Sequence, residues 1–201
     1  MLTAFQDLLF NCAISFDLPI LDWIQANLKS GFMDSFMPFI TKFGDHGLFW
    51  MIVAAVLLIF PKTRKPALGM AIAMAIGLVV CNMTLKPLVA RIRPYDLKFE
   101  YFGITIQLLG ERMHDFSFPS GHTIASFEAA VVLLKNNKKM GIPAMILAVL
   151  ISFSRLYLYV HYPTDVLCSV VLGTLFALIG NALAGLIAPK LGAGKKGKYE
   201  A

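Results

Sequence analysis

The sequence is poor in cysteine, with only three such residues in 201: Cys12, Cys81 and Cys168. Each lies in an apolar stretch, and the set contains no CxxC pair and no spacing typical of a metal site. The simplest interpretation is that they are small buried residues. The odd count says little about the redox compartment.

Charge is also scarce, since only 15% of the residues are charged whereas 58% are hydrophobic. With a mean hydropathy of +0.71, this composition excludes an ordinary soluble domain. The first residues lack the basic start of a cleaved signal peptide, and Asp7 and Asn11 interrupt the apolar run there. We see no internal repeat, so the length predicts a single domain over 1–201.

The net charge of +6 comes from basic residues that gather in short segments. They are Lys62, Arg64 and Lys65, then Lys135, Lys138 and Lys139, and finally Lys190, Lys195, Lys196 and Lys198 in the tail. Basic loops of this kind indicate cytoplasmic anchoring of a membrane protein, and not nucleic-acid binding.

Residues 1–45 mix apolar stripes with polar breaks, which is typical of amphipathic helices at a membrane interface or against a bundle. A true span over 1–16 remains an alternative, although a full crossing needs about 20 apolar residues. A break at 44–47 follows this segment.

Five apolar runs come after the break: 48–60, 67–85, 123–134, 142–160 and 166–188. The first is short for a span. The polar, irregular segment 86–118 is expected to form an outer loop, and 190–201 a flexible basic tail. The prediction is an all-α integral membrane bundle of five to six spans.

With five spans, the three basic segments fall on one side of the membrane, which positive-inside bias makes cytoplasmic together with the C-terminus. The segment 86–118 and the turn 161–165 then emerge at the outer face of the cell membrane. Three polar clusters therefore meet at that face.

The first cluster is Lys86 with Arg93-Pro94. A lysine at the end of a span usually extends to the headgroups, and Arg91 and Arg93 alone would be interpreted as surface charges. A guanidinium beside an ammonium nonetheless suits the oxygens of a phosphoryl group.

The second cluster, Pro119-Ser120-Gly121-His122, opens the run 123–134. A helix start with a glycine favours an anion, Ser120 adds a hydroxyl, and His122 can protonate a leaving oxygen. An ordinary helix cap is about equally compatible with this cluster alone.

The third cluster contains Arg155, His161 and Asp165. A charge inside an apolar run is costly unless it is paired or functional. A carboxylate four residues after a histidine can accept one imidazole N–H and leave the other nitrogen free to attack. A structural Arg–Asp ion pair is the alternative.

The order KPLVARIRP, PSGH and SRLYLYVHYPTD resembles the type 2 phosphatidic acid phosphatase (PAP2) superfamily, with its pattern K-x6-RP, PSGH and SR-x5-H-x3-D. Every specified position matches, over residues 86–165. The resemblance implies a haloperoxidase-like helical core and a phosphohydrolase that needs no metal and no cofactor. It implies that His161 is the nucleophile, that Asp165 orients it, and that His122 is the general acid. The phosphate would be held by Lys86, Arg93, Ser120, Gly121 and Arg155.

We therefore expect a membrane phosphatase that removes the terminal phosphate of a lipid phosphate or diphosphate through a phosphohistidine. Undecaprenyl diphosphate is the favoured substrate, and a phosphatidylglycerophosphate or phosphatidate phosphatase is the alternative. A lipid-phosphate binder without catalysis is a second alternative, which the two histidines argue against. Vanadium haloperoxidases share the motifs, but the apolar spans argue against them. The expected partners are the lipid substrate and the bilayer, and the oligomeric state stays open.

Glu128 lies within an apolar run but outside the motifs, and we expect it to be a structural hydrogen-bond partner inside the bundle. His46, His114 and Asp115 are interpreted as loop residues without a catalytic role.

Overall fold

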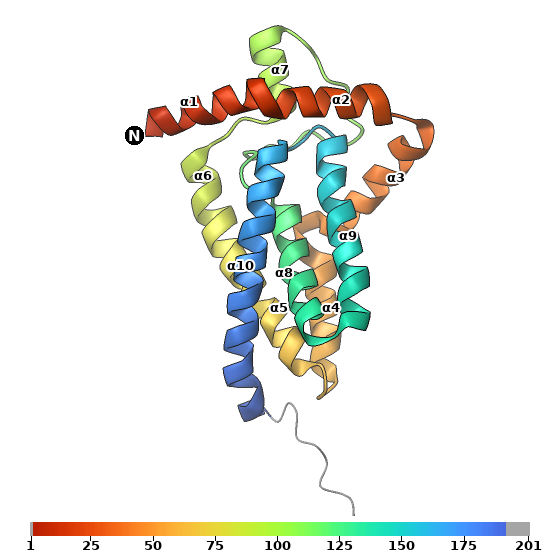
Figure 1. Ribbon diagram of the computed structural model, residues 1–201, viewed down its shortest axis with the longest axis vertical. Coiled ribbons are helices and arrows are strands. Elements are labelled where there is room, and N and C mark those ends of the chain that lie inside the picture. Colours follow the sequence, from red (N-terminus) through yellow and green to blue (C-terminus); the bar gives the residue numbers. More distant parts are fainter. Residues whose placement is uncertain (1, 192–201) are drawn as a thin grey trace, which may run out of the picture.

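The computed structural model describes residues 2–191, and within that range all regular elements are helices. The all-α prediction is confirmed (Figure 1). The α-helices are α1 (Leu2–Cys12), α2 (Leu18–Leu28), α3 (Gly31–Thr41), α4 (Leu48–Ile59), α5 (Arg64–Gly77), α6 (Lys86–Val89), α7 (Pro94–Phe102), α8 (Gly121–Asn136), α9 (Lys138–Tyr157) and α10 (Pro163–Ile187). Shorter π- and 3-10 segments are η1 (Ala13–Asp17), η2 (Lys42–Gly47), η3 (Leu78–Leu85) and η4 (Ala188–Leu191). The flexible tail predicted over 190–201 lies almost entirely outside the described residues.

Helix α8 is the central helix of the bundle. It packs against α5, α9 and α10, and ten of its sixteen residues are buried. At 1.5 Å per residue it is about 24 Å long, which is shorter than the hydrocarbon core of a bilayer. Surrounding helices therefore shield a helix that carries several polar side chains.

Small residues bring α5 and α10 into close contact. A Cβ atom added at Gly180 would lie 2.5 Å from the carbonyl oxygen of Gly69 and 2.8 Å from the backbone nitrogen of Ala73. Helices in membranes commonly associate through such small residues, because these let the backbones approach. This contact fixes the position of α5, and with it η3 and the first polar cluster.

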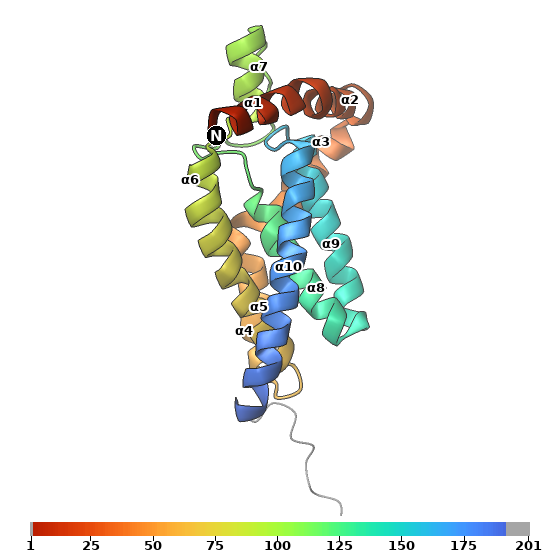
Figure 2. The ribbon, with the colours of Figure 1, turned by 60° about the vertical axis from the view of Figure 1, so that its left-hand side comes forward.

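Five segments are long and apolar enough to cross a membrane. They are Ala4–Leu28, Gly31–Ile59, Arg64–Phe102, Lys138–Tyr157 and Pro163–Ile187. The number matches the prediction, but the set differs, because α8 is too short at sixteen residues and an N-terminal segment replaces it. In both views α1 and α2 lie across the end of the bundle, so the N-terminal segment packs against the bundle, one of the two positions predicted for it (Figures 1 and 2).

Apolar side chains cover the outer surface of the bundle. Exposed examples on its helices are Ile59, Ile142, Ile146, Val149, Leu167, Val171 and Leu186. The N-terminal helices likewise expose Phe16, Trp23 and Phe32. Such a surface is suited to contact with lipid, and it agrees with the membrane location.

The two ends of the bundle differ in their loops. The connections α4–α5 and α8–α9 lie at one end, and α6, the end of α9 and the start of α10 lie at the other (Figure 1). The segment 86–118, expected to be irregular, contains α6 and α7, so that part of the prediction was wrong. The proline at position 94 explains the second helix, since proline is favoured in a first turn.

Candidate active site

The first cluster lies where the chain leaves the bundle and turns back. Helix α6 ends at Val89, and the next residue, Ala90, has a positive φ of 50°. Arg93 is extended, with φ −79° and ψ 155°, because the residue before a proline disfavours the helical region. This reversal turns the Arg93 side chain inward, where only 2% of it is exposed.

Arg93 is tied to two separate loops by backbone carbonyls. Its Nε donates to the carbonyl of Asp115 at 2.8 Å, and Nη1 donates to the carbonyl of Val160 at 2.6 Å. Nη2 reaches the carbonyl of Phe116 at 3.3 Å. These bonds fix the Arg93 guanidinium at this end of the bundle, and its position does not depend on a bound anion.

The second cluster begins α8. The backbone N–H of Ser120 donates to Ser169 Oγ at 2.9 Å, and its hydroxyl accepts from Thr123 at 3.1 Å. The Ser120 side chain makes no cap to α8. The first-turn N–H groups therefore have no side-chain cap from Ser120 and are available to an anion.

His122 meets a carboxylate that the sequence analysis missed. Its Nε2 lies 2.9 Å from Oδ1 of Asp45, in the break between α3 and α4. Gly44 makes room for the ring, because a Cβ there would lie 2.5 Å from His122 Cδ2. The break 44–47 therefore positions the predicted general acid.

The mutation Gly44→Ala should consequently lower kcat by about 10- to 100-fold, since the added methyl displaces the His122 ring by a fraction of an ångström to an ångström. Steady-state phosphate release measures this loss. Gly31→Ala is the matched control, because nothing lies within 4 Å of a Cβ at Gly31. Equal kcat in the two variants would contradict a positional role for Gly44.

The third cluster lies in the turn between α9 and α10. His161 is 2% exposed, and Asp165 is fully buried in the first turn of α10. Asp165 Oδ2 accepts from the Tyr162 backbone N–H at 3.1 Å, and so closes the start of the helix. Pro163 occupies the first position of α10, where its missing N–H costs nothing.

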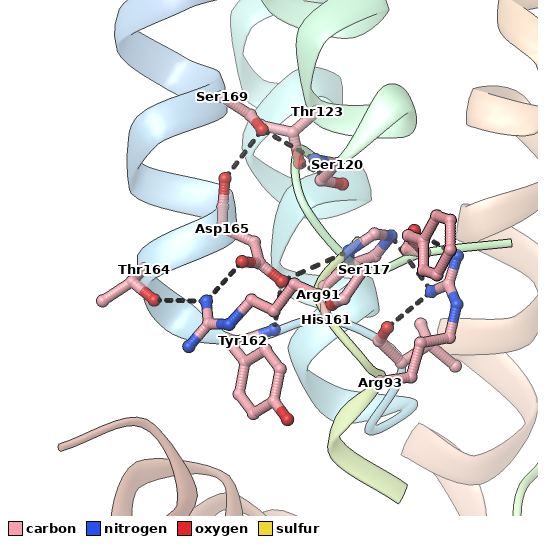
Figure 3. Close-up of polar contacts among 12 residues, drawn as sticks. Arg91, Arg93, Ser117, Ser120, Thr123, His161, Tyr162, Thr164, Asp165 and Ser169 are labelled. Carbon is pink, nitrogen blue, oxygen red and sulfur yellow. Dashed lines mark hydrogen bonds and ion pairs between the residues drawn. The ribbon is translucent and has the colours of Figure 1, made fainter. Parts of the chain in front are cut away.

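The expected hydrogen bond between His161 and Asp165 is not formed, because Nδ1 and Oδ2 lie 3.7 Å apart. Asp165 instead accepts from Ser117 Oγ and from Arg91 Nη1, each at 2.5 Å (Figure 3). Within the described residues, His161 Nδ1 has no hydrogen-bond partner. Hydrogen bonds from Ser117 and Arg91 therefore fix the Asp165 carboxylate in a position that faces the His161 imidazole.

Arg91 links Asp165 to the N-terminal helices, which the sequence analysis did not foresee. Its Nη2 lies 2.7 Å from Asp17 Oδ2, and its guanidinium lies 3.8 Å above the Tyr162 ring. Asp17 also accepts from the backbone N–H of Thr164 at 2.9 Å. The available signal was an aspartate between Phe16 and Leu18, since a buried charge is costly unless paired.

The surroundings of His161 favour its neutral form. Burial lowers the pKa of its imidazole well below the usual value, and the positive charges of Arg93, Arg155 and Lys86 lower it further. The opposite ring nitrogen, Nε2, lies 3.4 Å from Arg93 Nη1. A neutral imidazole at neutral pH keeps a lone pair for attack on phosphorus.

A cavity of about 570 Å³ joins the polar clusters to the bundle interior. Five predicted site residues line it: Lys86, Arg93, Gly121, His122 and His161. Its remaining walls are largely apolar and come mainly from α4 and α5, including Met51, Ala54, Leu58, Ala71 and Met74. One end of the cavity can therefore hold an anion, and the other an apolar chain.

The other three predicted residues lie behind the cavity wall. Ser120 and Asp165 are fully buried, and Arg155 is 3% exposed. Arg155 Nη1 donates to Thr41 Oγ1 at 2.5 Å, while its Nε has no partner among the described residues. Arg155 therefore adds positive charge near His161. Its Nε–H is a hydrogen-bond donor without an acceptor among the described residues.

Glu128 also lines the cavity, on the same face of α8 as Gly121. It faces the interior as expected, but its Oε1 has no hydrogen-bond partner within residues 2–191. Gly77 allows this position, because a Cβ there would lie 2.1 Å from Oε1. His46 and Asp115, interpreted from the sequence as loop residues, line the cavity as well.

Comparison with known proteins shows the family of this chain. The model of the PAP2 superfamily matches residues 66–185. A protein named undecaprenyl-diphosphatase from Sulfolobus acidocaldarius is 35% identical over 162 residues, which cover 80% of this chain and 75% of that protein.

Two solved structures share the fold. The structure of Aquifex aeolicus LpxE matches with a TM-score of 0.71 and 26% identity, and covers 83% of this chain and 94% of that one. A PAP2-type phosphatidylglycerolphosphate phosphatase from Bacillus subtilis matches with a TM-score of 0.67 and 25% identity, over 92% and 95% of the two chains.

Proposed function

Because the chain belongs to the PAP2 superfamily and is a multi-pass membrane phosphatase, we propose that it removes the terminal phosphate of a lipid diphosphate at the outer face of the cell membrane. The favoured substrate is undecaprenyl diphosphate, which would be converted to the monophosphate. The observation that carries this proposal is the cavity, because His161 and two cations lie at one end of a mostly apolar space.

In the proposed reaction, His161 Nε2 attacks the terminal phosphorus and forms a phosphohistidine. Lys86 and Arg93 stabilise the charge on the equatorial oxygens, and the uncapped start of α8 adds N–H donors. His122 protonates the departing lipid oxygen, and the neighbouring Asp45 holds its ring. Water, which gives a proton to the now neutral His122, then cleaves the phosphorus–nitrogen bond, so that inorganic phosphate leaves and both histidines are restored.

The lipid tail would lie along the walls from α4 and α5. A polyprenyl chain is a hydrocarbon, and it suits these walls because they offer few polar groups. The relative at 35% identity is named for undecaprenyl diphosphate, and this supports the same choice here. The alternative is a glycerophospholipid such as phosphatidylglycerophosphate, which the name of the Bacillus subtilis structure supports.

A substrate panel in detergent tests the proposal. We expect kcat/KM for undecaprenyl diphosphate to exceed that for phosphatidylglycerophosphate and phosphatidate by about tenfold or more, and to persist with a chelator present. A preference for a glycerophospholipid would favour the alternative substrate. Loss of all activity with chelator would contradict the metal-free reaction.

The proposed orientation rests on the basic loops that hold Lys62, Lys65, Lys138 and Lys139, at the end of the bundle opposite the site. A cysteine introduced near residue 100 should react with an impermeant reagent added to intact cells. Protection there, with reaction near residue 137, would reverse the orientation.

A further inference from the structure

Asp115 contacts both cations that line the polar end of the cavity. Its Oδ1 lies 2.5 Å from Arg93 Nη2, and its Oδ2 forms a short ion pair with Lys86 Nζ. Two carboxylate oxygens thus bind the nitrogens that two oxygens of a phosphate would bind. The same residue lines the cavity together with His161.

We propose that Asp115 is an internal competitor of phosphate, whose carboxylate must leave Lys86 and Arg93 before a phosphoryl group can bind. This inference rests on the proposed function, because that function assigns the two cations to phosphate. Asp115 thereby weakens the binding of every phosphate anion, so that inorganic phosphate alone binds poorly and leaves after turnover. A lipid substrate still binds because its tail adds contacts with the cavity walls.

The contacts of Arg93 argue against a positioning role for Asp115. Backbone carbonyls hold all three nitrogens of the guanidinium, including the carbonyl of Asp115 itself. Removing the carboxylate leaves these bonds in place, so the guanidinium keeps its position. Loss of the Asp115 carboxylate should therefore leave Lys86 and Arg93 available to an anion, without disordering the Arg93 side chain.

The carboxylate is also able to move. The Asp115 side chain is 52% exposed, and its oxygens bond no donor among residues 2–191 other than the two cations. Residues 103–120 form no regular helix. A rotation about the side-chain bonds is therefore enough to turn the carboxylate toward solvent.

The competitor remains charged at working pH. Partial burial would raise the pKa of the Asp115 carboxyl, but Lys86 and Arg93 lower it by more, and the net shift is below the usual value. A phosphate that entered with Asp115 in place would meet a like charge within a few ångströms. The two anions therefore exclude one another throughout the neutral range.

The test compares Asp115→Asn with the full-length wild-type protein in detergent. Dissociation constants for inorganic phosphate and orthovanadate, measured by calorimetry at fixed salt, should fall by about tenfold, and the KM for the lipid should fall in parallel. Asp115→Glu keeps the charge and should bind the anions nearly as weakly as the wild type. Asp96→Asn is the matched control, since its carboxylate pairs with Arg112 outside the cavity.

Unchanged or weaker anion binding in Asp115→Asn would overturn the inference and indicate that Asp115 positions the cations. If this variant does not fold by thermal melt, Asp115→Ser supplies the same comparison. The binding measurement needs no turnover, so it separates the two proposals. Failure of the wild type to hydrolyse any lipid phosphate would refute the proposed function and still leave the anion affinities to decide the role of Asp115.

Discussion

His161→Ala should reduce lipid phosphatase activity by about 10⁴-fold or more, because the nitrogen that attacks phosphorus is gone. The remaining cations should still bind the anion, since backbone carbonyls hold Arg93 and the substitution leaves Lys86 in place. We therefore expect loss of kcat with little change in orthovanadate affinity. Phosphate release and calorimetry measure the two quantities on the same preparation.

His114→Ala is the control for this experiment. His114 is exposed and does not line the cavity, although it lies beside Asp115 and Met113, which do. It should keep wild-type turnover. Full activity in His161→Ala would show that another group attacks, and a loss of activity in both variants would point to unfolding.

Asp165→Asn should lower kcat by about 10²- to 10⁴-fold, by analogy with the loss of the orienting carboxylate in other histidine-dependent enzymes. An amide lacks the negative charge that stabilises the His161 imidazole as its lone pair is donated to phosphorus. The distance of 3.7 Å between Nδ1 and Oδ2 needs only a small movement to become a hydrogen bond.

Asp17→Asn is the control that separates the loss of kcat in Asp165→Asn from the simple loss of an ion pair with Arg91. Both aspartates are fully buried and both pair with Arg91, but of the two only Asp165 faces His161, with its Oδ2 3.7 Å from Nδ1. Each substitution should destabilise the protein by about 3–5 kcal/mol, measured by thermal or denaturant unfolding. Only Asp165→Asn should show the large loss of kcat. Equal losses of kcat would mean that Asp165 acts only through the folded structure.

The sequence was informative where physical rules act along the chain. Apolar runs predicted α5 with η3, α9 and α10, because a span must be apolar over its length. Pro163 begins α10, and the spacing of His161 and Asp165 placed both at one turn. Pro94 begins α7, a helix that the sequence analysis did not predict. The sequence analysis wrongly counted α8 among the spans, although it is too short to cross a membrane. Neighbouring helices, and not its own composition, shield it from lipid.

Contacts between distant segments could not be read from the sequence. The pair of Asp45 with His122 and the pair of Asp17 with Arg91 each join residues more than seventy positions apart. Asp115 looked like an ordinary loop residue, because nothing in its neighbourhood along the chain shows that Lys86 and Arg93 will face it. Such groups become visible only when the fold brings their partners together.

The central claim is that His161 carries the phosphoryl group during turnover. Wild-type protein should be mixed with a lipid diphosphate labelled with ³²P in its terminal phosphate, quenched in alkali within milliseconds, and mapped by peptide. We predict a label that is stable to alkali and labile to acid on the peptide containing His161, and none in His161→Ala. A label on another residue, or turnover without any labelled protein, would contradict the account.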